Sequence, residues 1–172
     1  MVQSVDASKD RPSDPRNREV VHPVNGDPQI GNLETPINAS GLGKWLINIQ
    51  PGYRKGLTPF RRGFDVGVVQ GLWLIIPFVK LGPLRDTDIA NIAGLLSAYG
   101  LILISTTAIW LYAASQPPNP QVTVTTPNPP AELKTSAGWS EYGKGFLFGA
   151  LSGSTITYFV LSNWGVIQGL FN

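Results

Sequence analysis

Two oxygen donors lie close together in the stretch "RGFDVGVVQG" at residues 62–71, namely Asp65 and Gln70. The run around them is apolar, so each of these polar side chains costs free energy if the run enters hydrocarbon. Carboxylate and amide oxygens are ligands that a hard cation such as magnesium accepts readily. The pair therefore predicts either a set of ligands to such a cation or two local polar contacts.

Both local contacts are ordinary. In a helix, Asp65 follows Arg61 by four residues and Arg62 by three, and opposite charges at these spacings form ion pairs. Gln70 would then make an interhelical hydrogen bond. The available side chains disfavour an enzyme, because the single histidine, His22, lies in a polar segment and the chain has no cysteine. We also find no nucleophile–base pair and no glycine-rich phosphate loop before a helix.

The elements that must position these donors are membrane-spanning helices. Residues 89–116 and 145–172 carry no charged side chain, and each run exceeds the roughly 20 apolar residues that cross a bilayer. A third helix is predicted to begin at Thr58, which can cap it, with Pro59 at the first helical position. The sequence predicts an all-α membrane protein whose transmembrane helices span about 59–80, 87–115 and 139–163.

The rest of the chain is predicted to lie at the membrane surface. Residues 1–57 form an N-terminal arm, extended over residues 1–40, with a short interfacial helix that places Trp45, Leu46 and Ile49 on one side. Residues 58–172 form the transmembrane domain, with a surface loop at 116–138. Close to the first helix, the basic residues Arg54, Lys55, Arg61 and Arg62 outnumber Lys80 and Arg85 of the first loop. The positive-inside rule therefore puts the N-terminus in the cytoplasm and the C-terminus on the opposite side.

Small residues recur at every fourth position in two of these helices. One row is Gly145, Gly149 and Gly153, and the other is Ala90, Gly94 and Ala98. Such rows allow close approach of a neighbour in lipid. They predict either packing among the three helices or, on one face, contact with another chain or a flat ligand.

A flat ligand would also explain the two donors. Asp65 and Gln70 are then axial ligands to the magnesium of chlorophyll, whose ring nitrogens leave an axial position open. We expect a third row of small residues to keep the helix surface low enough for the ring. This row consists of Gly63, Gly67 and Gly71.

Four segments resemble a known family. They are "NGDPQIGNLETPI", "YRKGLTPFRRG", "FVKLGPLRDTDIANIAGL" and the terminal "GLFN", and they are similar to the cyanobacterial photosystem I subunit XI family, PsaL. The resemblance runs from about residue 23 to the end, and "FVKLGPLRD" is its most specific piece. Where the family usually has "EVGMAHG", this chain has "DVGVVQG", so the Glu position becomes Asp65 and the His position becomes Gln70.

The resemblance implies a non-catalytic structural subunit of the cellular thylakoid membrane, with a cytoplasmic N-terminus and a lumenal C-terminus. It implies binding of chlorophyll a, β-carotene and membrane lipids, and joining of photosystem I monomers into a trimer or tetramer. The implied partners are the photosystem I core subunits, neighbouring small membrane subunits and PsaL copies of adjacent monomers, without nucleic acid. The two changed ligands predict altered pigments, such as a red-shifted chlorophyll nearby. The residues alone leave one alternative open, a small accessory subunit of a membrane channel or transporter without pigment.

Overall fold

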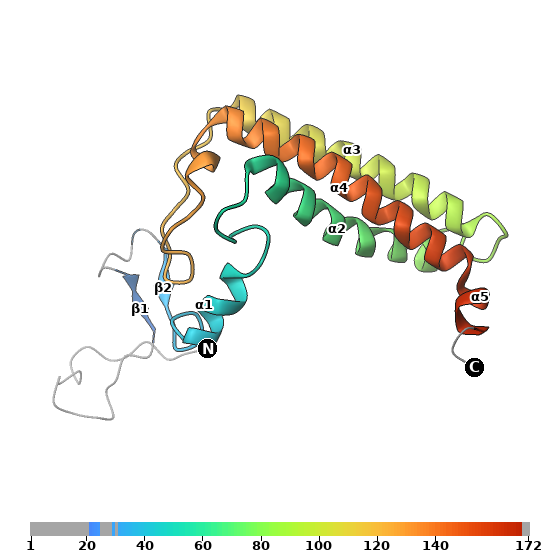
Figure 1. The fold of residues 1–172 in the computed structure, drawn as a ribbon, viewed down its shortest axis with the longest axis horizontal. Helices are drawn as coiled ribbons and strands as arrows, with labels where there is room; N and C mark the ends of the chain where they lie inside the picture. The colour runs from blue at the N-terminus through green and yellow to red at the C-terminus, as the bar shows by residue number, and fades with distance from the viewer. Residues whose placement is uncertain (1–20, 25–28, 30, 170–172) are drawn as a thin grey trace. The chain divides into compact units, whose positions relative to one another are not determined.

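The computed structural model of the chain describes residues 21–24, 29 and 31–169. Residues 1–20, 25–28 and 30 of the predicted N-terminal arm, and the terminal residues 170–172, lie outside the described part. Three long helices dominate the rest: α2 (Pro59–Leu81), α3 (Ala90–Ala114) and α4 (Ser136–Ser162) (Figure 1). All three are long and apolar enough to cross a membrane, which confirms the predicted fold class.

The shorter elements complete the chain. They are β1 (His22–Pro23), β2 (Leu33–Glu34), α1 (Gly41–Asn48), the 3-10 helix η3 (Ala131–Lys134) and α5 (Trp164–Gly169). The chain divides into two compact units, one made of the described residues up to Ile49 together with Gln121–Pro129, and the other of Gln50–Pro120 with the residues from Pro130 onward. The long helices all belong to the second unit.

The helix ends follow from local hydrogen bonds. Thr58 caps α2 as predicted, since its Oγ1 accepts from the backbone N–H of Arg61 at 3.2 Å. The third long helix begins at Ser136 rather than 139, because Thr135 Oγ1 accepts from Gly138 N at 3.0 Å and caps it there. The second begins at Ala90 rather than Thr87, because Thr87 closes a turn with the carbonyl of Leu84.

Two positions bear on helix continuity. α4 ends at Ser162 with Asn163 as its cap, and Gly165 lies inside the short helix α5. Pro77 leaves α2 one continuous helix, which runs four residues further to Leu81.

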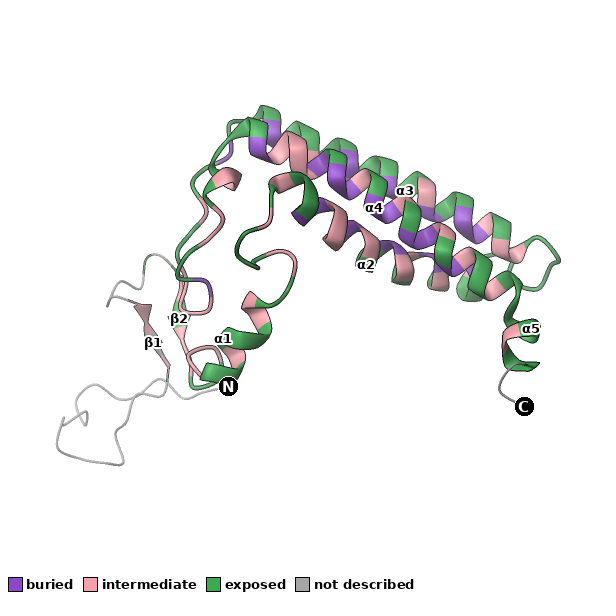
Figure 2. Cartoon of the chain, viewed as in Figure 1, coloured by how far each residue is buried: buried purple, intermediate pink, exposed green. Residues whose placement is uncertain are grey.

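Glycine rows on α2 and α4 face each other. A Cβ added to Gly63, Gly67 or Gly71 would overlap the carbonyl oxygens of Tyr142, Phe146 and Ala150 on α4, respectively. Reciprocally, a Cβ on Gly145, Gly149 or Gly153 would overlap backbone oxygens of α2. The two backbones are therefore in contact along their length, and Figure 2 shows the buried stripe that results. The expectation that the α2 glycines leave room for a flat ring is wrong, because α4 fills that space.

Polar side chains strengthen the same contact. Ser154 donates to the carbonyl oxygen of Gly71 at 3.1 Å, and Thr157 donates to that of Leu72 at 2.9 Å. Both hydroxyls are buried, and hydrogen bonds of this kind join helices where no water competes.

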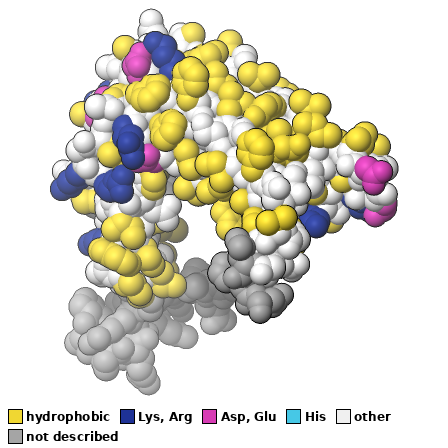
Figure 3. Space-filling model, turned by 45° about the vertical axis from the view of Figure 1, so that its right-hand side comes forward, with side chains coloured by type: hydrophobic (Ala, Val, Ile, Leu, Met, Phe, Trp, Pro, Cys, Tyr) yellow, Lys and Arg dark blue, Asp and Glu magenta, His cyan; other side chains and the backbone are white. Residues whose placement is uncertain are grey.

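The small-residue row of α3 is also used inside the bundle. Gly94 lies against Val79 of α2, and Ala98 is completely buried in a cluster with Ile75 and Leu95. All three small-residue rows found in the sequence therefore pack the three helices against each other, rather than against another chain or a flat ligand. Outward faces carry large apolar side chains, and Figure 3 shows them over much of the visible face, with charged groups gathered toward the ends of the helices.

The first unit is held by a small set of hydrogen bonds. Its strands β1 and β2 pair antiparallel over two residues each, and Asn48 Nδ2 donates to the carbonyl oxygen of Thr125 at 2.6 Å. The α1 helix is capped by Ser40 and is eight residues long. It exposes Trp45, Leu46 and Ile49, an apolar surface that suits a membrane interface.

Candidate functional site

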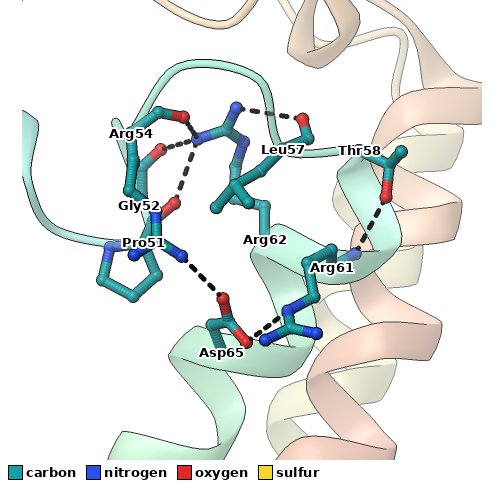
Figure 4. A network of polar contacts seen from close by, with 8 residues as sticks. All are labelled: Pro51, Gly52, Arg54, Leu57, Thr58, Arg61, Arg62 and Asp65. Carbon is teal, nitrogen blue, oxygen red and sulfur yellow. Dashed lines mark hydrogen bonds and ion pairs between the residues drawn. The ribbon is translucent and has the colours of Figure 1, made fainter.

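Asp65 is held by two arginines at the start of α2 (Figure 4). Its Oδ1 lies 2.7 Å from Nε of Arg61, and its Oδ2 lies 3.2 Å from Nη2 of Arg54. The carboxylate is mostly shielded from solvent, with 14% of the side chain exposed. Of the two ion pairs expected from helical spacing, the one with Arg61 is confirmed, whereas Arg62 turns elsewhere and Arg54 takes its place.

Arg62 is buried and binds the segment that precedes the helix. Its guanidinium donates to four backbone carbonyl oxygens, with Nη1 bound to Pro51 (3.0 Å), Gly52 (2.9 Å) and Arg54 (3.0 Å) and Nη2 bound to Leu57 (3.3 Å). Nη2 also pairs with Oε1 of Glu132 at 3.1 Å, which ties α2 to η3. Among the described residues, the Nε of Arg62 is the only buried side-chain nitrogen or oxygen without a hydrogen-bond partner.

The helical spacing predicted Arg62 only as an ion-pair partner of Asp65 and did not predict this role. The available signal was the pair of adjacent arginines at a helix start. Neighbouring residues on a helix point about 100° apart, so both cannot face the same surroundings. Gly56, with φ of 78°, allows the segment to turn back so that its carbonyls reach Arg62.

A groove of about 350 Å³ opens beside the same helix. One wall comes from the folded-back segment and the other from α2. The lining residues are Gln50, Pro51, Gly52, Tyr53, Val66, Val69, Gln70 and Trp73. The structure thus places Gln70 in an apolar groove beside a large aromatic ring, whereas Asp65 is outside the lining.

Gln70 is exposed and, within the part of the chain that the structure describes, has no hydrogen-bond partner. The expected interhelical hydrogen bond is therefore not formed there; Ser154 and Thr157 supply such bonds instead. An amide on the outer face of a spanning helix loses its hydration in hydrocarbon, which costs free energy unless a ligand or partner compensates. Its oxygen is free to act as a ligand.

The two donors have different capacities. Both oxygens of Asp65 are engaged, but a carboxylate has about four acceptor positions, so lone pairs remain. No group of three or more His, Cys, Asp or Glu side chains converges in the described ranges, so the site has no cage for a bare metal ion there. Its chemistry suits a cation that arrives inside an apolar ligand and lacks only axial donors.

Comparison with known proteins identifies the family of the chain. The sequence pattern of one family, described as "Photosystem I reaction centre subunit XI" (PsaL), matches residues 20–166. A protein of that name from Mastigocladus laminosus is 57% identical over 171 residues, which cover 99% of each chain, and one from Nostoc punctiforme is 56% identical over 172 residues with the same coverage. One from Thermosynechococcus vestitus is 45% identical over 158 residues, covering 90% of this chain and 98% of that protein. The family match and these relatives together show that the chain belongs to the PsaL family of photosystem I reaction centre subunit XI.

Proposed function

We propose that this photosystem I subunit binds chlorophyll a and carotenoid and joins photosystem I complexes into oligomers, without catalysing a reaction of its own. Family membership and the three spanning helices make the chain an integral subunit of photosystem I in the thylakoid membrane. An accessory subunit of a channel or transporter no longer fits, because relatives that cover nearly the whole chain carry the photosystem I name. Light-driven electron transfer then belongs to the other subunits of the complex.

One observation supports the pigment assignment most strongly: Gln70 presents an amide without an internal partner to an apolar groove that also holds Trp73. A chlorophyll placed there buries apolar surface and gives the amide oxygen a magnesium ion to bind. Asp65 is the second proposed ligand and uses the lone pairs that the arginines leave. When bound, the pigment supplies light absorption and excitation transfer; the residues bind it, orient it and exclude water.

The proposed orientation places the N-terminus in the cytoplasm and the C-terminus in the lumen. Arg54, Lys55 and Arg61 lie at or just before the N-terminal end of α2. At the other end, Lys80 lies in the last turn of α2 and Arg85 lies in the following loop beside Asp86. The positive-inside rule favours the first end as cytoplasmic. The division into an arm at 1–57 and a membrane domain at 58–172 follows this orientation.

The oligomer role draws on the outer faces of the bundle. Large apolar side chains remain exposed on all three spanning helices, for example Trp73, Leu103 and Phe148. These faces are available to core subunits, carotenoid, lipid and copies of this chain in adjacent complexes. The glycine rows already pack the helices of this chain against each other. Contacts of the outer faces with other molecules therefore depend on the larger apolar side chains.

Deletion of the gene for this subunit tests the oligomer role. We expect photosystem I solubilised in mild detergent to shift from trimers or tetramers to monomers, and expression of this chain to restore the larger species. Sedimentation and native electrophoresis measure the size of the complex. The same strain expressing an unrelated gene from the same promoter is the control. If the oligomers persist without the subunit, the proposed role in joining complexes is wrong.

A further inference from the structure

Arg62 connects the two walls of the groove. It belongs to the helix that supplies Val66, Gln70 and Trp73. Its guanidinium binds the segment that supplies the opposite wall, which consists of Gln50, Pro51, Gly52 and Tyr53. Two of the carbonyls that it binds, those of Pro51 and Gly52, belong to the wall itself.

The wall segment depends on this one side chain for much of its conformation. Four of its carbonyl oxygens, between Pro51 and Leu57, converge on a single guanidinium. Removal of the guanidinium leaves these partly buried acceptors without their donor, and the lost hydrogen bonds favour a rearrangement of the segment. The planar fork of arginine suits this arrangement, because its donors diverge in one plane toward several oxygens.

We propose that Arg62 is the positioning residue of the pigment groove. It sets the separation between the Pro51–Gly52–Tyr53 wall and the Gln70 amide, and this separation determines how firmly a pigment is held there and how its ring is oriented. The inference rests on the proposed function, since it takes chlorophyll as the occupant of the groove. Arg62 does not touch the pigment in this account; it acts through the wall.

A purely structural role for Arg62 predicts something different. The Glu132 ion pair ties α2 to η3, so loss of the charge could weaken the bundle as a whole. In that case every property of the subunit would fall together, including its amount in the complex. A positioning role instead changes the pigment signal of complexes in which the subunit is still present.

The test compares Arg62→Gln, Arg62→Lys, Gln70→Leu and Lys55→Gln in intact photosystem I. Lys55 is the matched control, because it is an exposed cation of the same segment that lies outside the groove. Subunit content per complex is measured by mass spectrometry. Circular dichroism in the chlorophyll bands, low-temperature emission and chlorophyll content per complex report the pigment.

We expect Arg62→Gln to lose the same bands and the same chlorophyll as Gln70→Leu at parental subunit content. Arg62→Lys keeps the charge but offers fewer donors, so it should shift these bands, while Lys55→Gln matches the parent. Parental spectra from Arg62→Gln, alongside altered spectra from Gln70→Leu, would overturn the inference and leave the proposed function intact. Parental spectra from Gln70→Leu would instead refute Gln70 as a ligand. If Arg62→Gln fails to accumulate, the inference is tested with Arg62→Lys instead. An unshifted spectrum of the Arg62→Lys complex would then overturn the inference.

Discussion

Gly149→Leu removes this subunit from photosystem I, because the leucine side chain would occupy the space of the α2 backbone. Even the first added carbon would overlap the carbonyl oxygen of Phe64, which belongs to the facing helix. Neither helix can yield locally, since glycines one turn away on both sides make the same kind of contact. The helices must separate, which also breaks the hydrogen bond from Ser154 to Gly71.

Two alanine variants test both the direction and the magnitude of the expected change in stability. We expect Gly149→Ala to lower the free energy of unfolding by about 1–3 kcal/mol, the usual cost of overpacking. Gly100→Ala should be neutral or stabilise α3 by up to about 1 kcal/mol, because alanine is the better helix former and no atom lies within 4 Å of its Cβ. The amount of subunit in the complex, and the temperature at which solubilised photosystem I releases it, measure both effects. Equal stability of the two alanine variants would contradict the close α2–α4 contact.

Gln70→Leu is expected to remove a chlorophyll from every complex that contains this subunit. Leucine keeps the groove apolar and close to its present volume but offers no oxygen, so the magnesium loses its axial donor. The matched control is Gln168→Leu, which removes an exposed amide from α5, outside the groove. Chlorophyll content per complex and low-temperature emission are the measurements.

Substitutions that change the donor atom or its charge give a second test of the two proposed ligand side chains. Gln70→His replaces the amide oxygen by a nitrogen donor, so the pigment should be retained with a different lowest-energy absorption. Asp65→Asn keeps an oxygen but leaves Arg54 and Arg61 without their counter-charge, so it should disturb both the ligand and the helix start. Identical emission from the parent, Gln70→His and Gln70→Leu complexes would show that no pigment depends on this side chain.

Local chemistry in the sequence is enough to predict the start of α2 and the first ion pair. Thr58 caps α2 because a hydroxyl before a proline-initiated helix satisfies an otherwise free N–H. The Arg61–Asp65 pair forms because both residues lie on one helix face. The start of α4 at Ser136 escaped prediction, because a threonine within a proline-rich loop has several equally good partners until the loop is folded.

Of the candidate site, the sequence predicted the two oxygen donors but not the groove. Asp65 and Gln70 stand out in the sequence because polar side chains are costly in a spanning helix. Gln70 lines the groove, whereas Asp65 does not. This difference arises because the segment 50–57 folds back over α2. This return requires the buried Arg62 and the left-handed Gly56, which no periodicity reveals.

The sequence by itself determined that three helices can cross the membrane, because hydrocarbon favours long, mainly apolar segments with internally bonded backbones. Only the tertiary structure decided what the small residues do. Glycine rows suit any close neighbour equally well, so their spacing cannot distinguish a pigment from a helix. Here the rows of α2 and α4 contact each other, which leaves the Gln70 groove, rather than the glycine face, as the place for a ligand.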